Sequence, residues 1–180
     1  MDQFMEIKSE HPDTILFFRM GDFYELFYED AEEASEVLGL ALTSRDKNAD
    51  VPIPMAGFPG HALEDNLRKM IKSGVKVTVA EQEDKLRDGD KLLERVFTRV
   101  YTPGSLYEES LLSSDERSLL SAIILDKEQL GMGVIDASTG ESWASTWSGN
   151  DRFSRAMDEI LRWNPAEIVI STKDSENPNL

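Results

Sequence analysis

Apolar segments of two kinds alternate along the first half of the chain. Residues 14–20 are apolar and β-prone, which predicts a buried strand. In residues 23–38, apolar side chains recur every three or four positions and acidic side chains lie largely on the other side, so a helix is expected there. The glycine that follows is a suitable C-terminal stop. Residues 40–43 are expected to form a short strand.

The next segment predicts a stiff loop, a second helix and two strands. Three prolines and Gly57 fall within residues 45–59, which indicates a loop of well-defined shape. Apolar spacing predicts a helix over 61–73, and alternation predicts a strand over 75–80. A further strand is expected over 95–101. This β-α-β-α-β-β order indicates a small mixed α/β domain with helices packed against a sheet.

The clearest turn in the chain is Thr102-Pro103-Gly104, because proline fixes its own φ and glycine accepts a positive φ. A polar stretch with little apolar periodicity follows it. We therefore expect one domain over 1–104, a linker over 105–117 and a partial second domain over 118–180.

The second domain shows its own pattern of short strands. Strands are expected over 119–125, 133–137 and 141–146, then a helix over 151–163 and a strand over 166–170. The result is a β-β-β-α-β unit. Even a complete domain of about sixty residues buries only ~60% of the surface that its unfolded chain exposes. We therefore expect the chain to be a fragment that is cut inside its second domain.

Composition narrows the chemistry. The 180 residues carry 19 basic and 35 acidic side chains, and the net charge of −16 disfavours nonspecific binding to nucleic acid or anionic membranes. The chain has no cysteine, which excludes disulfides, thiolate metal sites and cysteine nucleophiles, and it has two histidines, so metal catalysis would have to use carboxylates. No catalytic residue and no metal site is assigned. No apolar run approaches the ~18 residues of a membrane span and no signal segment is evident, so a cytoplasmic protein is expected.

The negative charge is unevenly distributed. Residues 1–44 carry two basic and eleven acidic side chains, residues 45–100 carry eleven and ten, and residues 101–180 carry six and fourteen. Only the middle block could face phosphate without strong repulsion. A solvated surface position is the alternative role for each of its candidate phosphate contacts, which are Arg45, Lys47, Arg68, Lys69, Lys72, Lys76, Arg95 and Arg99.

The segment 19–28 is the most informative in the chain. Asp22 could cap the predicted helix, and Glu25 could complete a capping box. Capping explains these acids but not the aromatic residues of the segment, which are Phe23, Tyr24, Phe27 and Tyr28. Since these rings go around more than one helix face, at least one should be exposed and available for stacking.

Several motifs occur in a recognisable order. They are Arg19-Met-Gly-Asp-Phe-Tyr-Glu-Leu-Phe-Tyr28, Pro52-Ile-Pro-Met-Ala-Gly57 with His61, Ala80-Glu-Gln82, and Arg99-Val-Tyr-Thr-Pro-Gly104. Over about residues 10–112 the chain closely resembles the N-terminal mismatch-recognition domain of the MutS family of DNA mismatch repair proteins. Residues 118–170 resemble the start of the MutS connector domain. This resemblance implies a small mixed-sheet α+β domain followed by a partial ribonuclease-H-like unit. Residues 83–94 depart from the family pattern by their high charge.

The resemblance also implies a site. In the family a Phe-x-Glu motif enters the minor groove, so Phe23 would stack on a mispaired base and Glu25 would share a hydrogen bond with it. A wedge must unstack a base step at a cost on the order of a few kcal/mol, and mismatched bases surrender less stacking and pairing. Glu25 would favour bases that supply a proton or a donor. Further DNA contacts are expected from Met55, with a plain turn as the alternative role of its loop, and from Arg45, Arg95 and Arg99.

Partners and cofactors follow from the same resemblance. The expected ligand is double-stranded DNA with mismatches or small loops; the full-length protein would also contact the second subunit of a dimer and other repair proteins. ATP and magnesium are expected only for the full-length protein, because this chain has no Gly-x-x-x-x-Gly-Lys-Ser/Thr loop and is not expected to be an enzyme.

The sequence leaves two alternative functions open. One is a connector module that docks repair proteins. The other is a metal-dependent ribonuclease-H-like nuclease, with strand-end turn chemistry as the alternative role of Asp136. Its candidate carboxylates are Asp126, Asp136, Glu141 and Asp158.

Overall fold

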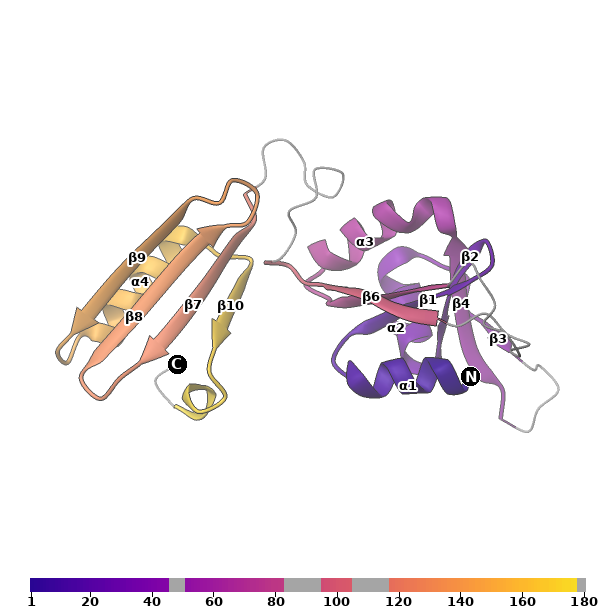
Figure 1. The fold of residues 1–180 in the computed structure, drawn as a ribbon, viewed down its shortest axis with the longest axis horizontal. Coiled ribbons are helices and arrows are strands. Elements are labelled where there is room, and N and C mark those ends of the chain that lie inside the picture. The colour runs from indigo at the N-terminus through magenta and orange to yellow at the C-terminus, as the bar shows by residue number, and fades with distance from the viewer. Residues whose placement is uncertain (46–50, 83–94, 105–116, 178–180) are drawn as a thin grey trace. The chain divides into compact units, whose positions relative to one another are not determined.

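The computed structural model describes residues 1–45, 51–82, 95–104 and 117–177. The chain divides into two compact units, Met1–Thr102 and Pro103–Leu180, and each builds its own sheet (Figure 1). Both units are mixed α/β structures, as the sequence predicts. Three features named from the sequence lie outside the described residues: Lys47, the charged segment 83–94, and the expected linker apart from Arg117.

A mixed sheet of six strands forms the first unit, in the order β3-β4-β2-β1-β5-β6. The strands are β1 (Ile15–Met20), β2 (Phe23–Phe27), β3 (Thr43–Arg45), β4 (Ile53–Pro59), β5 (Val77–Gln82) and β6 (Arg95–Tyr101). β1 and β5 run parallel, whereas the other neighbouring strands are antiparallel. β2 therefore lies inside the sheet with a partner on each side.

Helices cover both faces of this sheet. They are α1 (Asp2–Glu10), α2 (Tyr28–Leu38), the short 3-10 helix η1 (Gly60–Ala62) and α3 (Leu63–Lys72). α1 packs through Phe4 against a buried cluster that includes Phe18 and Phe27, and α3 lies on the other side of the sheet (Figure 1). An ion pair ties α1 to α2, because Lys8 Nζ is 2.7 Å from the buried carboxylate of Asp30.

The expected helix over 23–38 is wrong in its first part. Residues 23–27 form β2 because their backbone pairs with both β1 and β4, and α2 begins at Tyr28. Asp22 consequently caps no helix, and Glu25 completes no capping box. Asp22 lies in the turn between β1 and β2, where its carbonyl accepts a hydrogen bond from the Gly60 amide at 2.7 Å.

The proline-rich segment also differs from its prediction as a loop. Ile53–Pro59 forms β4, with prolines at its second and last positions, near the two ends of the strand. The strand expected over 40–43 lies at Thr43–Arg45 instead and pairs with β4. The helix expected over 61–73 and the strands expected over 75–80 and 95–101 are confirmed, with shifted ends, as η1 with α3, β5 and β6.

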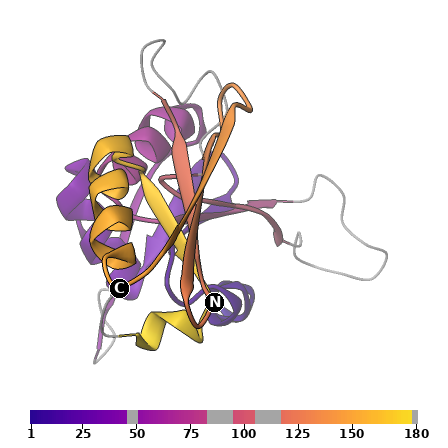
Figure 2. The same cartoon turned by 90° about the vertical axis from the view of Figure 1, so that its left-hand side faces the viewer.

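The second unit has the predicted β-β-β-α-β order. Its elements are β7 (Leu119–Leu125), β8 (Gln129–Asp136), β9 (Ser142–Ser148), α4 (Arg152–Trp163), β10 (Glu167–Ile170) and the 3-10 helix η2 (Asp174–Glu176). The sheet order is β10-β7-β8-β9, and only the β10–β7 pair is parallel among these described strands. α4 packs on one face of the sheet, over a core that includes Ile123, Leu130 and Trp147 (Figure 2).

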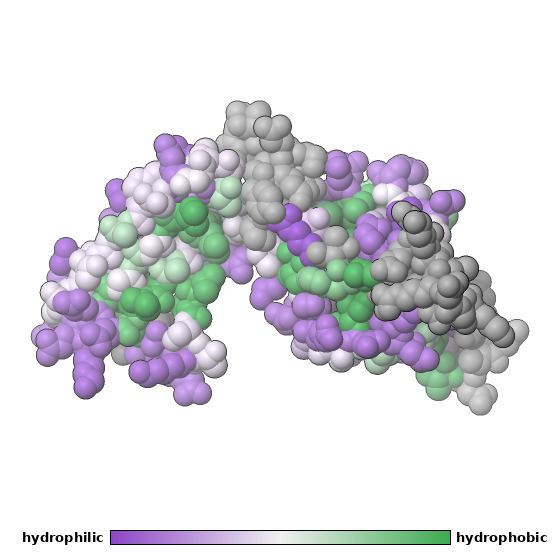
Figure 3. Space-filling model, viewed as in Figure 1, coloured by the Kyte–Doolittle hydropathy of each residue, from purple (hydrophilic) through white to green (hydrophobic). Residues whose placement is uncertain are grey.

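The opposite face of this second sheet is apolar, and no described helix or strand of the second unit covers it. Ile124, Ile135 and Val169 are exposed, and Figure 3 shows hydrophobic side chains gathered over β7 and β8 on the face that is turned to the viewer. Contiguous apolar patches of this kind mark interaction surfaces.

No helix in the described part of the chain is long and apolar enough to cross a membrane.

Candidate nucleic-acid interface

Phe23 stands at the start of β2, directly after a tight turn. Gly21 adopts a φ of 60°, a left-handed conformation that glycine takes without strain. The Phe23 backbone pairs with Met20 on one side and with Pro59 on the other. The side chain is nevertheless 49% exposed. The fold therefore presents a large apolar ring to solvent from a backbone that is fixed on both sides.

Strand alternation places Glu25 on the same face as Phe23. Glu25 lies opposite Phe18 and Gly57, and its side chain is partly exposed. Phe27 follows on this face but is buried, because the ring of Phe4 packs edge-on against it with the centroids 5.2 Å apart. The exposed part of β2 is therefore the end that carries Phe23 and Glu25.

Tyr24, between these two residues, points to the opposite face and is 1% exposed. Its hydroxyl donates a hydrogen bond to the carboxylate of Glu81, and its ring stacks on Phe58 with the centroids 5.5 Å apart. The Arg19 guanidinium carbon lies 5.0 Å from the Tyr24 ring centroid. Burial, and then the hydrogen bond to Glu81, raises the pKa of Tyr24 above its usual range. Tyr24 thus anchors the centre of the Phe-Tyr-Glu motif in the core.

The end of β5 fastens the turn before Phe23. The Gly21 amide donates a hydrogen bond of 3.0 Å to Gln82 Oε1, and Arg19 Nε donates one of 2.6 Å to the Gly21 carbonyl. The sequence alone did not predict a role for Glu81 or Gln82. Only the parallel pairing of β1 with β5 brings these two residues to the hairpin. These residues are positioning residues for the turn.

Close backbone approach explains one glycine of the motifs. A Cβ atom on Gly57 would lie 2.9 Å from the Tyr24 carbonyl oxygen, which is too close without a shift of β4 against β2. Gly57 therefore allows β4 to pair tightly beside Glu25.

Met55 and Arg45, two of the other predicted DNA contacts, do not lie beside Phe23. Met55 is paired with Phe27 in β4 and packs against the Phe4 cluster, so the plain-turn alternative for its segment is wrong. The Arg45 guanidinium carbon is 5.6 Å from the Phe27 ring centroid. Both residues lie at the far end of β2.

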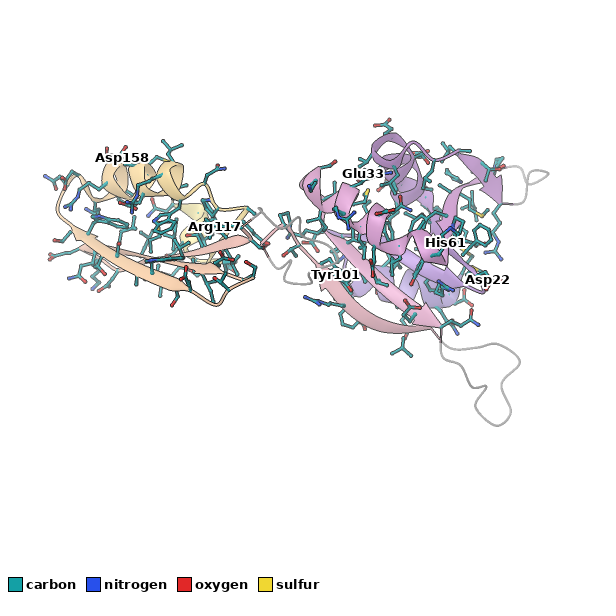
Figure 4. The ribbon with its side chains drawn as sticks, turned by 90° about the horizontal axis from the view of Figure 1, so that it is seen from above. Asp22, Glu33, His61, Tyr101, Arg117 and Asp158 are labelled. Atoms are coloured by element: carbon teal, nitrogen blue, oxygen red, sulfur yellow. The ribbon has the colours of Figure 1, made fainter. Side chains whose placement is uncertain are left out.

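Two arginines lie on β6, separated from β2 by β1 and β5. The Arg99 guanidinium carbon is 4.8 Å from the Tyr101 ring centroid, and the Arg95 backbone pairs with Gln82. The Arg95 side chain lies outside the described residues. Figure 4 shows Tyr101 at the end of the unit that is opposite Asp22 and His61.

The remaining basic candidates belong to the surface of the first unit. Arg68 pairs with Asp65 at 2.9 Å, and Lys76 pairs with Asp13 at 3.1 Å. Lys69 and Lys72 occupy the last turn of α3, where cations suit the helix dipole. Local structure accounts for the placement of these four side chains.

The four candidate carboxylates of the second unit form no group that could hold a metal ion. Asp136 is buried and accepts hydrogen bonds from the Ser138 hydroxyl at 2.6 Å and the Ser138 amide at 3.0 Å, and the hydroxyl bond is the main cause of its lowered pKa. Asp136 thus serves the turn after β8. Asp126, Glu141 and Asp158 are exposed, and Figure 4 shows Asp158 on α4. Within the described ranges, no group of three acidic or histidine side chains could hold a metal ion.

Tyr24→Phe should lower the free energy of unfolding of the first unit by about 1 kcal/mol at neutral pH, because the hydrogen bond to Glu81 is lost. The raised pKa of Tyr24 adds a pH dependence, because above about pH 10 the unfolded chain loses the Tyr24 proton while the folded chain keeps it. The wild type therefore loses stability as the pH rises, and the difference in the free energy of unfolding between wild type and Tyr24→Phe becomes smaller. Urea unfolding followed by far-ultraviolet circular dichroism measures this. Tyr28→Phe is the matched control, and the three tryptophans, all in the second unit, report that unit separately. A difference that stays constant from pH 8 to pH 11 would contradict the assignment.

Comparison with known proteins identifies the family. The family model described as MutS domain I matches residues 1–110. The chain is 42% identical over 175 residues to a protein of Syntrophomonas wolfei subsp. wolfei and 37% identical over 177 residues to one of Caldanaerobacter subterraneus subsp. tengcongensis, both named DNA mismatch repair protein MutS. The alignments cover 97% and 98% of this chain and 20% of each relative, so the chain spans about a fifth of the length of these curated relatives. With its mixed six-stranded sheet and its Phe-Tyr-Glu hairpin, the chain belongs to the MutS domain I family.

Proposed function

We propose that the first unit recognises mispaired or unpaired bases in double-stranded DNA, with Phe23 as an intercalating wedge and Glu25 as the group that discriminates between bases. The names of the relatives support a role in mismatch repair. The observation that carries the proposal is the hairpin itself: Phe23 is half exposed and shares a face with Glu25, while Tyr24 between them is buried.

A wedge of this kind works through the deformability of DNA. An apolar ring that enters a base step must unstack it, at a cost on the order of a few kcal/mol, and this cost is lower where pairing is already defective. A ring on a mobile loop would lose conformational freedom on insertion. The Phe23 backbone is held by two strands before DNA arrives, so little further ordering is required.

Glu25 sets the selectivity in this proposal. A carboxylate near the duplex is repelled by phosphate, and this penalty is offset only where a base offers a proton or a hydrogen-bond donor. A sound base pair keeps its donors in the pair. Glu25 therefore weakens binding to intact duplex more than binding to a mismatch.

The isolated chain should bind DNA weakly. Its net charge of −16 opposes association with a polyanion, and the Arg45 and Arg99 side chains lie near Phe27 and Tyr101 and form no basic patch with Phe23. In the full-length protein, we propose that further domains make most of the phosphate contacts, carry the ATPase site and contact the second subunit. A cytoplasmic location belongs to the same proposal.

One observation favours a second candidate function. The uncovered apolar face of the β7–β10 sheet would suit a module that docks other repair proteins. It would replace the first proposal if the chain bound a repair protein while the full-length protein showed no preference for mismatched DNA.

Phe23→Ala in the full-length protein should weaken binding to a single-mismatch duplex by about 1–3 kcal/mol, roughly five- to 150-fold, because base–aromatic stacking is lost. Phe97→Ala is the matched control, since Phe97 is 42% exposed on β6 and stacks on His11 instead. Fluorescence anisotropy with heteroduplex and homoduplex measures both variants. Equal heteroduplex affinity in Phe23→Ala and wild type would refute the wedge.

Glu25→Gln should raise the affinity for homoduplex, because the charge repulsion is removed while the side chain keeps its shape. The ratio of heteroduplex to homoduplex affinity, which is the gap between the two, should therefore become smaller. The gap should narrow by several-fold at low ionic strength. Glu29→Gln, which removes an exposed acid of the neighbouring helix, is the control. A variant that loses affinity for both duplexes in equal proportion would show that Glu25 contributes uniform binding and no discrimination.

A further inference from the structure

The first unit also carries an open groove that the proposed DNA site does not use. It encloses about 370 Å³ between α1 and the start of α2. Its floor is formed by Phe4 and Phe27, which are buried core residues. Met5 and Tyr28 form its walls, and they are 52% and 37% exposed. An apolar depression of this size falls within the range of ligand-binding pockets.

Tyr28 is held in this wall at a conformational cost. Its φ is 56°, a left-handed backbone conformation that costs non-glycine residues on the order of 1–3 kcal/mol. The ring lies tilted against Phe4, with the centroids 6.3 Å apart. Asparagine or glycine would take this backbone conformation more easily. The exposed part of this aromatic ring is available for contact with a ligand.

The rim of the groove is acidic. Glu29 and Glu32 line it and are exposed. The third carboxylate of the groove, Asp30, is already satisfied by Lys8 Nζ at 2.7 Å and by the Leu16 amide at 2.9 Å. Neither Glu29 nor Glu32 has an ion-pair partner in the described part of the chain, so the groove presents two negative charges beside an apolar floor.

This charge selects among occupants. Duplex DNA would bring phosphates toward Glu29 and Glu32, and a second copy of this chain would bring a net charge of −16. Both associations are opposed by repulsion. A basic peptide would be attracted, and its apolar side chain would cover the exposed surfaces of Met5 and Tyr28. Exposed methionine suits such a surface because its flexible thioether adapts to the ligand.

We propose that this groove binds a protein segment in which a bulky apolar side chain lies between lysine or arginine residues. The apolar side chain occupies the space between Met5 and Tyr28, and the basic residues meet Glu29 and Glu32. The partner is thus a basic protein segment, and the site is independent of Phe23 and Glu25.

The probe is the synthetic peptide Lys-Lys-Leu-Phe-Lys-Lys with blocked ends. Two control peptides replace Leu-Phe by Ala-Ala or every lysine by glutamate. The 180-residue chain, labelled with ¹³C at its seven methionine methyl groups, reports binding by nuclear magnetic resonance. The Met5 signal should shift in a saturable way with the first peptide only, and the signal of Met157, which lies in the second unit, should not move.

A matched pair of double variants tests the charge. Glu29→Gln with Glu32→Gln should weaken the probe about three- to tenfold at low ionic strength. Glu33→Gln with Glu36→Gln changes the same charge at the same spacing on α2 with exposed residues outside the groove, and should leave the affinity within about twofold. Tyr28→Asn, which suits the left-handed backbone, should stay folded and lose affinity.

Several outcomes would overturn the proposal. They are a Met5 signal that does not shift, equal binding of the Ala-Ala or glutamate peptide, equal effects of the two double variants, and unchanged affinity in Tyr28→Asn. A Met5 shift produced by duplex DNA or by higher protein concentration alone would also overturn it, because the occupant would then be nucleic acid or a second copy. None of these outcomes depends on mismatch recognition.

Discussion

The backbone pairing of β2 on both of its edges is the constraint on which the candidate site depends. Pairing with β1 and β4 forces the Phe-Tyr-Glu motif into an extended conformation, and extension forces alternate side chains to opposite faces. Tyr24 is drawn into the core, where Phe58, Arg19 and Glu81 surround it. Phe23 and Glu25 must then project together from the other face. A helix over the same residues would have separated them by about 200° around its axis.

The acidic charge of the first unit affects how it can bind DNA. Its first 44 residues hold eleven of the 35 acidic side chains, and the groove between α1 and α2 lies in that block. The hairpin belongs to the same acidic segment, so nonspecific attraction to DNA is weak there. A wedge that gains little from phosphate contacts depends more on the ease with which the duplex opens. Low intrinsic affinity and high selectivity therefore have one physical origin in the proposed function.

Local patterns predicted much of the fold, and they failed where pairing between distant segments decides the outcome. Phe23, Leu26 and Phe27 fit helical spacing, whereas Tyr24 and Leu26 fit strand alternation. The strand forms because the backbone of these residues pairs with β4, which lies about thirty residues later in the chain. The exposure of one aromatic ring was predicted correctly from a helix that does not exist at these residues. The three prolines of the next segment obscured β4. Glu81 and Gln82 gained roles only from the parallel β1–β5 pairing, and the groove required α1, whose few buried residues gave a faint pattern.

The most direct test of the wedge locates position 23 on DNA. The full-length protein with p-benzoylphenylalanine at position 23 is irradiated on a duplex with a single mismatch, and the cross-linked nucleotides are mapped at base resolution. If Phe23 is the wedge, the cross-links will be confined to the mispaired base and its neighbours, with none on the matched homoduplex and none from the same group placed at position 97. Cross-links spread evenly along both duplexes, or no cross-link from position 23 while the protein is bound to the mismatch, would contradict this role of Phe23.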